Sequence, residues 1–172
     1  MKTLILGGVR SGKSRLAERL ALESGLPVTY VATATAGDEE MRARIAVHRE
    51  RRPASWVVVE EPLALAEVLS AHARPGGVLL VDCLTLWLTN LLLDADAARL
   101  GREREELLHA LPELPGEIVL VSNETGMGVV PTGELTRRYC DEAGWMHQDL
   151  ARLCDRVIFT VAGLPHLLKG EL

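Results

Sequence analysis

Short apolar runs alternate along the chain with segments whose apolar residues recur at helical spacing. Nearly continuous apolar runs cover 2–6, 28–32, 56–59, 78–82, 117–121 and 157–161. Such runs are typical of parallel strands that are covered by helices on both faces. Segments of helical length lie between them, at 13–24, 38–52, 62–71, 84–93, 103–111 and 134–153. The alternation predicts an α/β fold with a doubly wound, mostly parallel sheet that gathers ligands at the carboxyl ends of its strands.

Helix starts and apolar content add two details to this pattern. Pro62 would occupy a favoured first-turn position of the helix at 62–71. The segment 84–93, LTLWLTNLLL, is apolar around most of a helical circumference, so part of it is either buried core or a subunit contact. It is ten residues long, well under the roughly 20 residues that cross a bilayer.

The composition predicts one cytoplasmic domain over residues 1–172. A chain of 172 residues is long enough to bury a core without metals or disulfides. The net charge of −5 opposes nucleic-acid binding, which needs a basic surface. The cysteines, Cys83, Cys140 and Cys154, are odd in number and widely spaced, as expected of reduced thiols. The N-terminal MKTLIL runs into glycines and is too short for a signal-peptide core, so we expect a soluble protein without a membrane span.

A phosphate-binding loop lies between the first predicted strand and the first predicted helix. The sequence there is Gly7-Gly8-Val9-Arg10-Ser11-Gly12-Lys13-Ser14, which fits the pattern GxxxxGK[ST] in its required context. Glycines let backbone N–H groups surround the phosphates, and the helix N-terminus adds a favourable dipole. Lys13 should reach the β and γ phosphates, and Ser14 should coordinate Mg²⁺. The fold expected is therefore that of a P-loop NTPase.

Two further strand ends carry polar residues. Asp82 ends the apolar run VLLVD, where it could hold Mg²⁺ or its water, although an acid in this place is often only a helix cap. Asn123 and Glu124 follow the run ending at 121 and precede flexible glycines. A loop of this composition either lines an active site or merely turns the chain, and the pattern alone does not decide between them.

The charged segment 38–52 has two possible interpretations, one functional and one purely structural. If it is helical, His48 shares a face with Arg44, Arg51 and Arg52. Cationic neighbours would keep the imidazole neutral and able to act as a nucleophile or base, and the arginines could hold a polyphosphate. Alternatively, the segment is a solvated basic helix end in which the arginines complement the helix dipole. The pattern alone favours the second reading.

Five segments, in order and spacing, resemble one family across nearly the whole chain. They are GGVRSGKS, YVATATAGDEEMRARIAVHRERRPASW, VLLVDCLTLWLTNLL, VLVSNETGMGVVP and RRYCDEAGWMHQDLA. The chain is similar in these to the bifunctional adenosylcobinamide kinase/adenosylcobinamide-phosphate guanylyltransferases of cobalamin biosynthesis. The P-loop is widely shared among proteins, whereas RxxxHxxxRPxxW and NExGMGxVP are much more specific.

This resemblance implies a substrate and a set of site residues. It implies ATP- or GTP-dependent phosphorylation of the aminopropanol hydroxyl of adenosylcobinamide. Transfer of GMP from GTP would follow through a GMP-histidine at His48, with release of pyrophosphate and formation of adenosylcobinamide-GDP. It also implies a homotrimer with its site near a subunit boundary, and GTP contacts at residues 7–14 and at Ala32, Thr33, Ala34, Arg49, Glu50, Arg51, Arg52, Glu60 and Asp82.

The sequence departs from the family in two places and leaves one role empty. Asp82 stands where some members have Glu, which keeps the charge beside the metal, and His147 stands where Asn is usual. We assign no role to position 147 and no general base to the kinase step. Two rivals remain: a kinase with a single activity in which His48 is incidental, and a nucleotide-switched binding module without a small-molecule substrate.

Overall fold

One seven-stranded sheet holds every strand of the described part of the chain. The computed structural model describes residues 1–35, 39 and 53–171. The strand order is β3-β2-β4-β5-β1-β6-β7. All neighbouring pairs are parallel except β6 and β7. The strands are β1 (Lys2–Gly7), β2 (Val28–Ala32), β3 (Val57–Glu60), β4 (Val78–Asp82), β5 (Glu117–Asn123), β6 (Arg156–Val161) and β7 (Leu164–Lys169).

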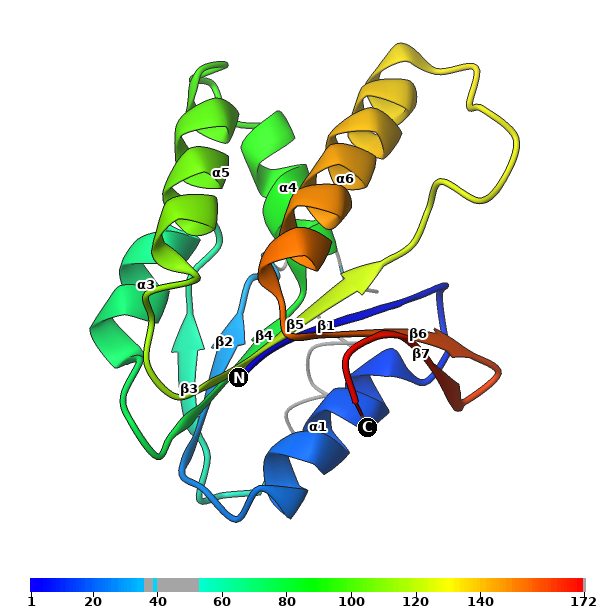
Figure 1. Cartoon of the computed structure of the whole chain (residues 1–172). Helices are drawn as coiled ribbons and strands as arrows, with labels where there is room; N and C mark the ends of the chain where they lie inside the picture. The colour runs from blue at the N-terminus through cyan, green and yellow to red at the C-terminus, as the bar shows by residue number, and fades with distance from the viewer. Residues whose placement is uncertain (36–38, 40–52, 172) are drawn as a thin grey trace.

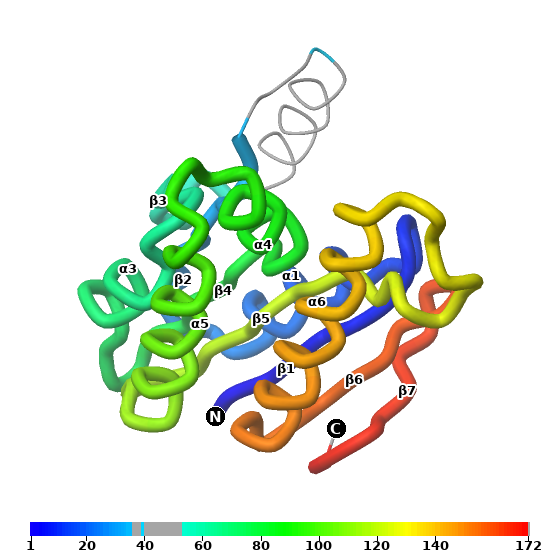
Figure 2. The backbone as a smooth tube through the Cα atoms, turned by 90° about the horizontal axis from the view of Figure 1, so that it is seen from above, coloured from blue at the N-terminus to red at the C-terminus, as the bar shows by residue number. Residues whose placement is uncertain are grey.

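Helices cover both faces of this sheet, as the sequence predicted. One described helix, α1 (Lys13–Glu23), packs on one face. Four helices pack on the other: α3 (Leu65–His72), α4 (Leu84–Leu92), α5 (Arg99–Ala110) and α6 (Glu134–Leu153) (Figure 1). Seen from above, α4 and α6 lie over the central strands and α3 and α5 lie toward the β3 edge (Figure 2). None of the described helices combines the length and apolarity that a membrane crossing requires.

Side chains of the continuous apolar strands pack into two separate cores, one on each face of the sheet. In β1, Leu4 and Leu6 join the core under the four helices, whereas Ile5 joins the core under α1. Successive strand side chains point to opposite faces, so a strand that is covered on both faces needs apolar residues at every position. Helix α4 belongs to the first of these cores, where Trp87 and Leu91 are almost fully buried. Its apolar circumference is therefore explained largely by burial within the chain.

The predicted elements are present in the described residues, with two shifts at helix starts. Helix α3 begins at Leu65 rather than at 62, because the Glu61 carboxylate accepts hydrogen bonds from the N–H groups of Leu63 and Ala64. This turn puts Pro62 ahead of the helix, so the prediction that it occupies the first turn was wrong. Helix α5 begins at Arg99 rather than at 103, and its first turn holds one buried apolar residue, Leu100, among polar residues and a glycine. The helix expected at 38–52 lies outside the described residues.

Strand β7 was not predicted. It pairs antiparallel with β6 through a tight turn at Ala162 and Gly163, whose φ values are 51° and 81°. Two successive residues with positive φ are the requirement of the turn that best fits a two-residue hairpin. Most residues of β7 are exposed, so the strand lacks the apolar continuity of the others. The N–H of Gly163 donates to Ser11 O at 2.8 Å, and the hairpin thus supports the phosphate-binding loop.

Candidate active site

The strand register brings the predicted site residues to one edge of the sheet. Gly7 at the end of β1 pairs with Asn123 at the end of β5. Ala32 at the end of β2 pairs with Asp82 on one side and with Glu60 on the other. Parallel strands end at the same edge, and ligands of such sheets bind at that edge.

The loop from Gly7 to Lys13 has the strand–loop–helix geometry that phosphate binding requires. Gly12 caps α1 with a left-handed φ of 98°, and a Cβ there would lie 3.0 Å from Gly163 Cα. A Cβ on Gly7 would lie 2.6 Å from Thr160 O, which no ordinary contact tolerates. Glycine is therefore required at both positions, by close approach of the backbone and by conformation. The first turn of α1 presents its N–H groups at this edge.

Lys13 is drawn in toward the loop that it belongs to. Its Nζ donates to Gly8 O at 3.1 Å, and the residue is largely buried. Burial lowers the pKa of the Lys13 ammonium, and attraction to Asp82 opposes that shift. A bound polyphosphate would add negative charge beside this ammonium and stabilise its charged form. The partly desolvated Lys13 ammonium would therefore favour the binding of an anionic ligand.

Asp82 lies two strands from the P-loop and is fixed by a buried tyrosine. Its Oδ2 accepts from Tyr30 Oη at 3.1 Å, and Tyr30 stacks on Trp56 with ring centroids 6.4 Å apart. A carboxylate has about four lone-pair positions, so Asp82 can accept further contacts.

A magnesium ion suits the oxygen groups at this edge. The Ser14 hydroxyl and the Asp82 carboxylate are the hard ligands that Mg²⁺ takes together with waters and phosphates. Among the described residues, no group of three or more histidine, cysteine or acidic side chains is placed to hold a metal. An ion here would thus depend on the phosphates of a nucleotide for several of its ligands.

The segment Ala32 to Ala34 is held by its own buried contacts. Thr33 Oγ1 donates to Cys83 O at 2.6 Å and accepts from Cys83 N at 3.0 Å, and Thr33 is fully buried. Asn90 Nδ2 donates to Thr33 O at 2.8 Å. The Thr33 hydroxyl is therefore committed to the backbone after β4, and nucleotide contact at residues 32–34 remains a prediction. Burial raises the pKa of the Cys83 thiol to about 11, so it is a neutral group and not a nucleophile.

Thr33→Val tests this structural assignment. The substitution keeps the shape but leaves the buried N–H of Cys83 without its partner, whereas Cys83 O still accepts from Trp87 N. We expect the free energy of unfolding to fall by about 1–3 kcal/mol. Urea denaturation measures it, with Thr132→Val at an exposed position as the matched control. Equal stabilities of the two variants would contradict the assignment.

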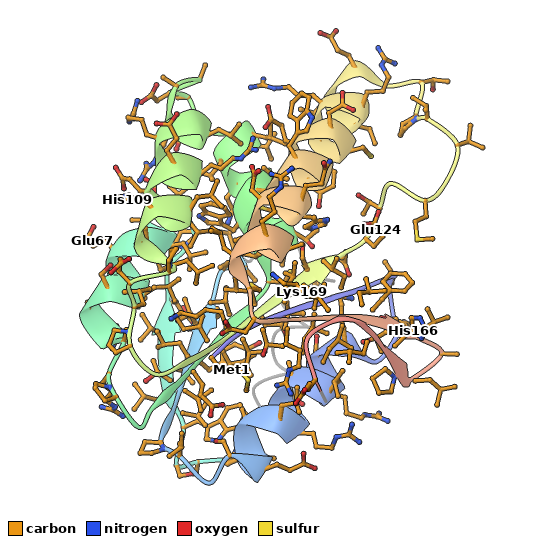
Figure 3. All side chains as sticks on the ribbon, in the orientation of Figure 1. Met1, Glu67, His109, Glu124, His166 and Lys169 are labelled. Atoms are coloured by element: carbon orange, nitrogen blue, oxygen red, sulfur yellow. The ribbon has the colours of Figure 1, made fainter. Side chains whose placement is uncertain are left out.

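The end of β5 carries a buried polar cluster that the sequence did not predict. Glu124 N donates to Gly7 O at 3.0 Å, which joins this strand end to the P-loop. His147 of α6 is buried, with Nε2 2.8 Å from Ser122 Oγ and Nδ1 3.6 Å from Glu124 Oε2. Figure 3 shows Glu124 where β5 leads into the loop toward α6. A histidine at a core position of α6, next to Met146 and three residues before Leu150, was the available signal.

The remaining predicted residues lie apart from the P-loop or outside the described chain. Four strand spacings separate β3 from β1, so Glu60 is about 19 Å from Gly7 along the edge. Glu60 is exposed at the end of β3. The predicted residues His48, Arg49, Glu50, Arg51 and Arg52 lie outside the described residues. The predicted contacts that the structure describes thus divide into a P-loop group and a group at the ends of β2, β3 and β4.

Comparisons with solved structures confirm the P-loop type of α/β fold. The RadB recombinase superposes with a TM-score of 0.51 at 18% identity, covering 92% of this chain and 73% of that one. A protein of Pyrococcus horikoshii OT3 superposes with a TM-score of 0.56 at 11% identity, covering 99% of this chain and 87% of that one. At these identities the likeness concerns the fold alone.

Proteins found by sequence comparison are much more similar to this chain than the two solved structures are. The bifunctional adenosylcobalamin biosynthesis protein CobP of Pseudomonas aeruginosa is 70% identical over 171 residues, covering 99% of each chain. The bifunctional adenosylcobalamin biosynthesis protein CobU of Escherichia coli K12 is 40% identical, covering 98% of this chain and 100% of its own. The family model for cobinamide kinase / cobinamide phosphate guanyltransferase matches residues 3–168. The chain therefore belongs to the cobinamide kinase / cobinamide phosphate guanyltransferase family and is an enzyme.

Proposed function

We propose that this enzyme phosphorylates adenosylcobinamide with ATP or GTP and then transfers GMP from GTP to the resulting phosphate. The products are adenosylcobinamide-GDP and pyrophosphate, in the assembly of the nucleotide loop of adenosylcobalamin. The observation that carries this proposal is the pairing of a complete P-loop with Asp82 at one sheet edge, in a chain of this family. The whole chain, residues 1–172, would act as one nucleotide-binding kinase and guanylyltransferase domain.

The P-loop group would hold the triphosphate in the kinase step. Gly7, Gly8, Val9, Arg10, Ser11 and Gly12 would surround the phosphates with backbone N–H groups, and Lys13 would neutralise the β and γ phosphates. Ser14 and Asp82 would hold Mg²⁺, which supplies charge neutralisation and orientation of the phosphates. Phosphoryl transfer depends mostly on such positioning and electrostatic stabilisation.

His48 would be the nucleophile of the guanylyl transfer. A neutral imidazole nitrogen would attack the α-phosphorus of GTP, form a phosphorus–nitrogen bond and expel pyrophosphate. The phosphate of adenosylcobinamide phosphate would then attack the same phosphorus and release His48. Ala32, Thr33, Ala34, Glu60 and the segment Arg49 to Arg52 would contact GTP. This assignment is supported by the specific motif around His48 and by the family to which the chain belongs.

We also propose a cytoplasmic homotrimer with the site near a subunit boundary. Support for assembly comes from the loop after β5, where Met127, Val129 and Val130 are largely exposed. Solvent-exposed apolar residues gathered on one loop are typical of a surface that another molecule covers. The three free cysteines fit a reducing compartment. Light scattering that reports a monomer at working concentration would contradict the assembly.

A two-step assay tests the proposed reactions. Purified protein is given adenosylcobinamide with ATP and Mg²⁺, then GTP, and the corrinoid products are separated by chromatography. We expect adenosylcobinamide phosphate first and adenosylcobinamide-GDP after GTP is added. Phosphorylation without any guanylylated product would favour the kinase with a single activity, and nucleotide hydrolysis unaffected by adenosylcobinamide would favour a binding module.

A further inference from the structure

The cluster at the end of β5 forms a chain of polar groups that ends on one carboxylate. Burial lowers the pKa of His147, and attraction to Glu124 opposes this, so the imidazole is predominantly neutral at pH 7. A neutral imidazole has one N–H donor and one acceptor nitrogen. With Nδ1–H directed at Glu124 Oε2, Nε2 accepts the hydroxyl hydrogen of Ser122.

The series of hydrogen-bonded polar groups continues on the other side of Ser122, at Thr85. Thr85 Oγ1 lies 3.4 Å from Ser122 Oγ and accepts from Asn123 N at 2.7 Å. A hydroxyl has one hydrogen and two lone pairs, so Thr85 can accept from Asn123 N and also donate toward Ser122. Donors then follow one another from Thr85 through Ser122 and His147 to Glu124. Groups aligned in one direction strengthen each other, and the orientation of His147 is fixed by its two neighbours.

The Glu124 carboxylate retains capacity beyond these contacts. Gly126 N donates to Oε1 at 2.5 Å, and His147 faces Oε2. Each carboxylate oxygen has two lone-pair positions, so both oxygens can accept another proton donor. The side chain is 22% exposed, which leaves it accessible from the ligand edge.

The position of Glu124 is also suited to the phosphoryl-transfer step. Strand β5 lies between β1, which leads into the P-loop, and β4, which ends at Asp82. The hydrogen bond from Glu124 N to Gly7 O holds the residue beside the first glycine of the loop. Among the described residues, Glu124 is thus a carboxylate that lies between the P-loop and Asp82, the acid predicted to hold Mg²⁺.

We propose that Glu124 is the catalytic residue that accepts the hydroxyl proton of the corrinoid substrate in the kinase step, and that His147 is its positioning residue. This inference rests on the proposed function. The substrate hydroxyl oxygen attacks the γ-phosphorus, a new oxygen–phosphorus bond forms, and the bond between the γ-phosphorus and the β,γ-bridging oxygen breaks. The hydroxyl proton passes to a Glu124 oxygen, and the nucleoside diphosphate leaves with the electron pair.

Glu124→Gln separates the role of Glu124 as a base from its role as the acceptor of the hydrogen bond from Gly126 N. The amide oxygen of glutamine can still accept from Gly126 N, but it has no useful basicity. We expect kcat for adenosylcobinamide phosphorylation to fall about 100-fold, the usual effect of a general base. The KM for the corrinoid and the dissociation constant for GTP should stay near wild type. Glu134→Gln, at the exposed start of α6, makes the same chemical change as a control.

Two further variants keep the proposal falsifiable. Glu124→Asp retains a carboxylate at a shorter reach, so its kcat should lie between those of wild type and Glu124→Gln. His147→Ala should lower kcat about 10-fold with little change in KM, because the base is misplaced while substrate binding is kept. His147→Asn, which keeps a donor and an acceptor, should recover most of the loss, and His109→Ala on the exposed face of α5 should have no effect.

The outcomes distinguish this inference from the proposed function. If wild type phosphorylates adenosylcobinamide and Glu124→Gln does so with an equal kcat, Glu124 is not the base, although the proposed function stands. Equal kcat values for the Gln and Asp variants, or parallel losses of kcat and GTP affinity, would likewise overturn the inference. If wild type cannot phosphorylate adenosylcobinamide at all, the proposed function and this inference fail together.

Discussion

Lys13→Ala is expected to disable the kinase and the guanylyltransferase together. Both reactions are proposed to need a triphosphate whose charge is neutralised by the Lys13 ammonium, which lies within the loop and 3.1 Å from Gly8 O. Removing one charged group that stabilises a transition state typically costs about 100-fold to 1,000-fold in kcat. The effect should appear in adenosylcobinamide phosphorylation and in pyrophosphate release from GTP, measured on the same protein preparation.

Arg19→Ala is the matched control for Lys13→Ala. Arg19 also lies on α1, but its side chain is 58% exposed and pairs with Glu23 at the surface. Such exposed pairs contribute little to stability, so both activities should stay near wild type. Retention of either activity by Lys13→Ala would show that the two reactions do not share this loop.

His48→Ala is expected to separate the two activities. If His48 is the guanylylated residue, the variant should lose guanylyl transfer by a factor of about 10,000 or more, as removal of a covalent nucleophile does. Phosphorylation of adenosylcobinamide should continue, since that step would need the P-loop, the metal and alignment of the substrate. Both rates are measured by chromatography of the corrinoid products, with adenosylcobinamide phosphate supplied directly for the second.

His166→Ala provides the control for loss of a histidine. His166 is exposed on β7, and its replacement should leave both activities unchanged (Figure 3). Guanylyl transfer that persists in His48→Ala would exclude the covalent role of His48. Loss of both activities would show instead that His48 is needed for binding or folding.

The central strands were predictable because they are buried on both faces, and β3 was predictable because its valines form an apolar run although they are largely exposed. The apolar runs in β1, β4 and β5 supply side chains to two cores, so apolar residues fill their central positions. β7 is exposed on the open edge of the sheet, so its residues need not be continuously apolar. Its signal was a two-residue turn, Ala162 and Gly163, whose alanine is an unusual choice for positive φ.

The site was predictable where it is local in the chain and not where it depends on packing. The P-loop is one continuous segment between a strand and a helix, and Asp82 is marked by the end of an apolar run. The contact of Thr33 with Cys83 joins residues 50 positions apart, and that of His147 with Ser122 joins residues 25 apart. The first pair depends on β2 lying beside β4 and the second on α6 packing on the sheet, and neither can be predicted from a spacing within the sequence.

Mass spectrometry of the intact protein tests the central proposal most directly. Wild type is incubated with GTP and Mg²⁺ in the absence of any corrinoid, and the protein mass and released pyrophosphate are measured. We expect a gain of one GMP per chain, in a bond that acid cleaves and alkali does not, as expected of a phosphorus–nitrogen linkage at His48. Formation of adenosylcobinamide-GDP by a protein that never carries GMP would contradict it and indicate direct transfer.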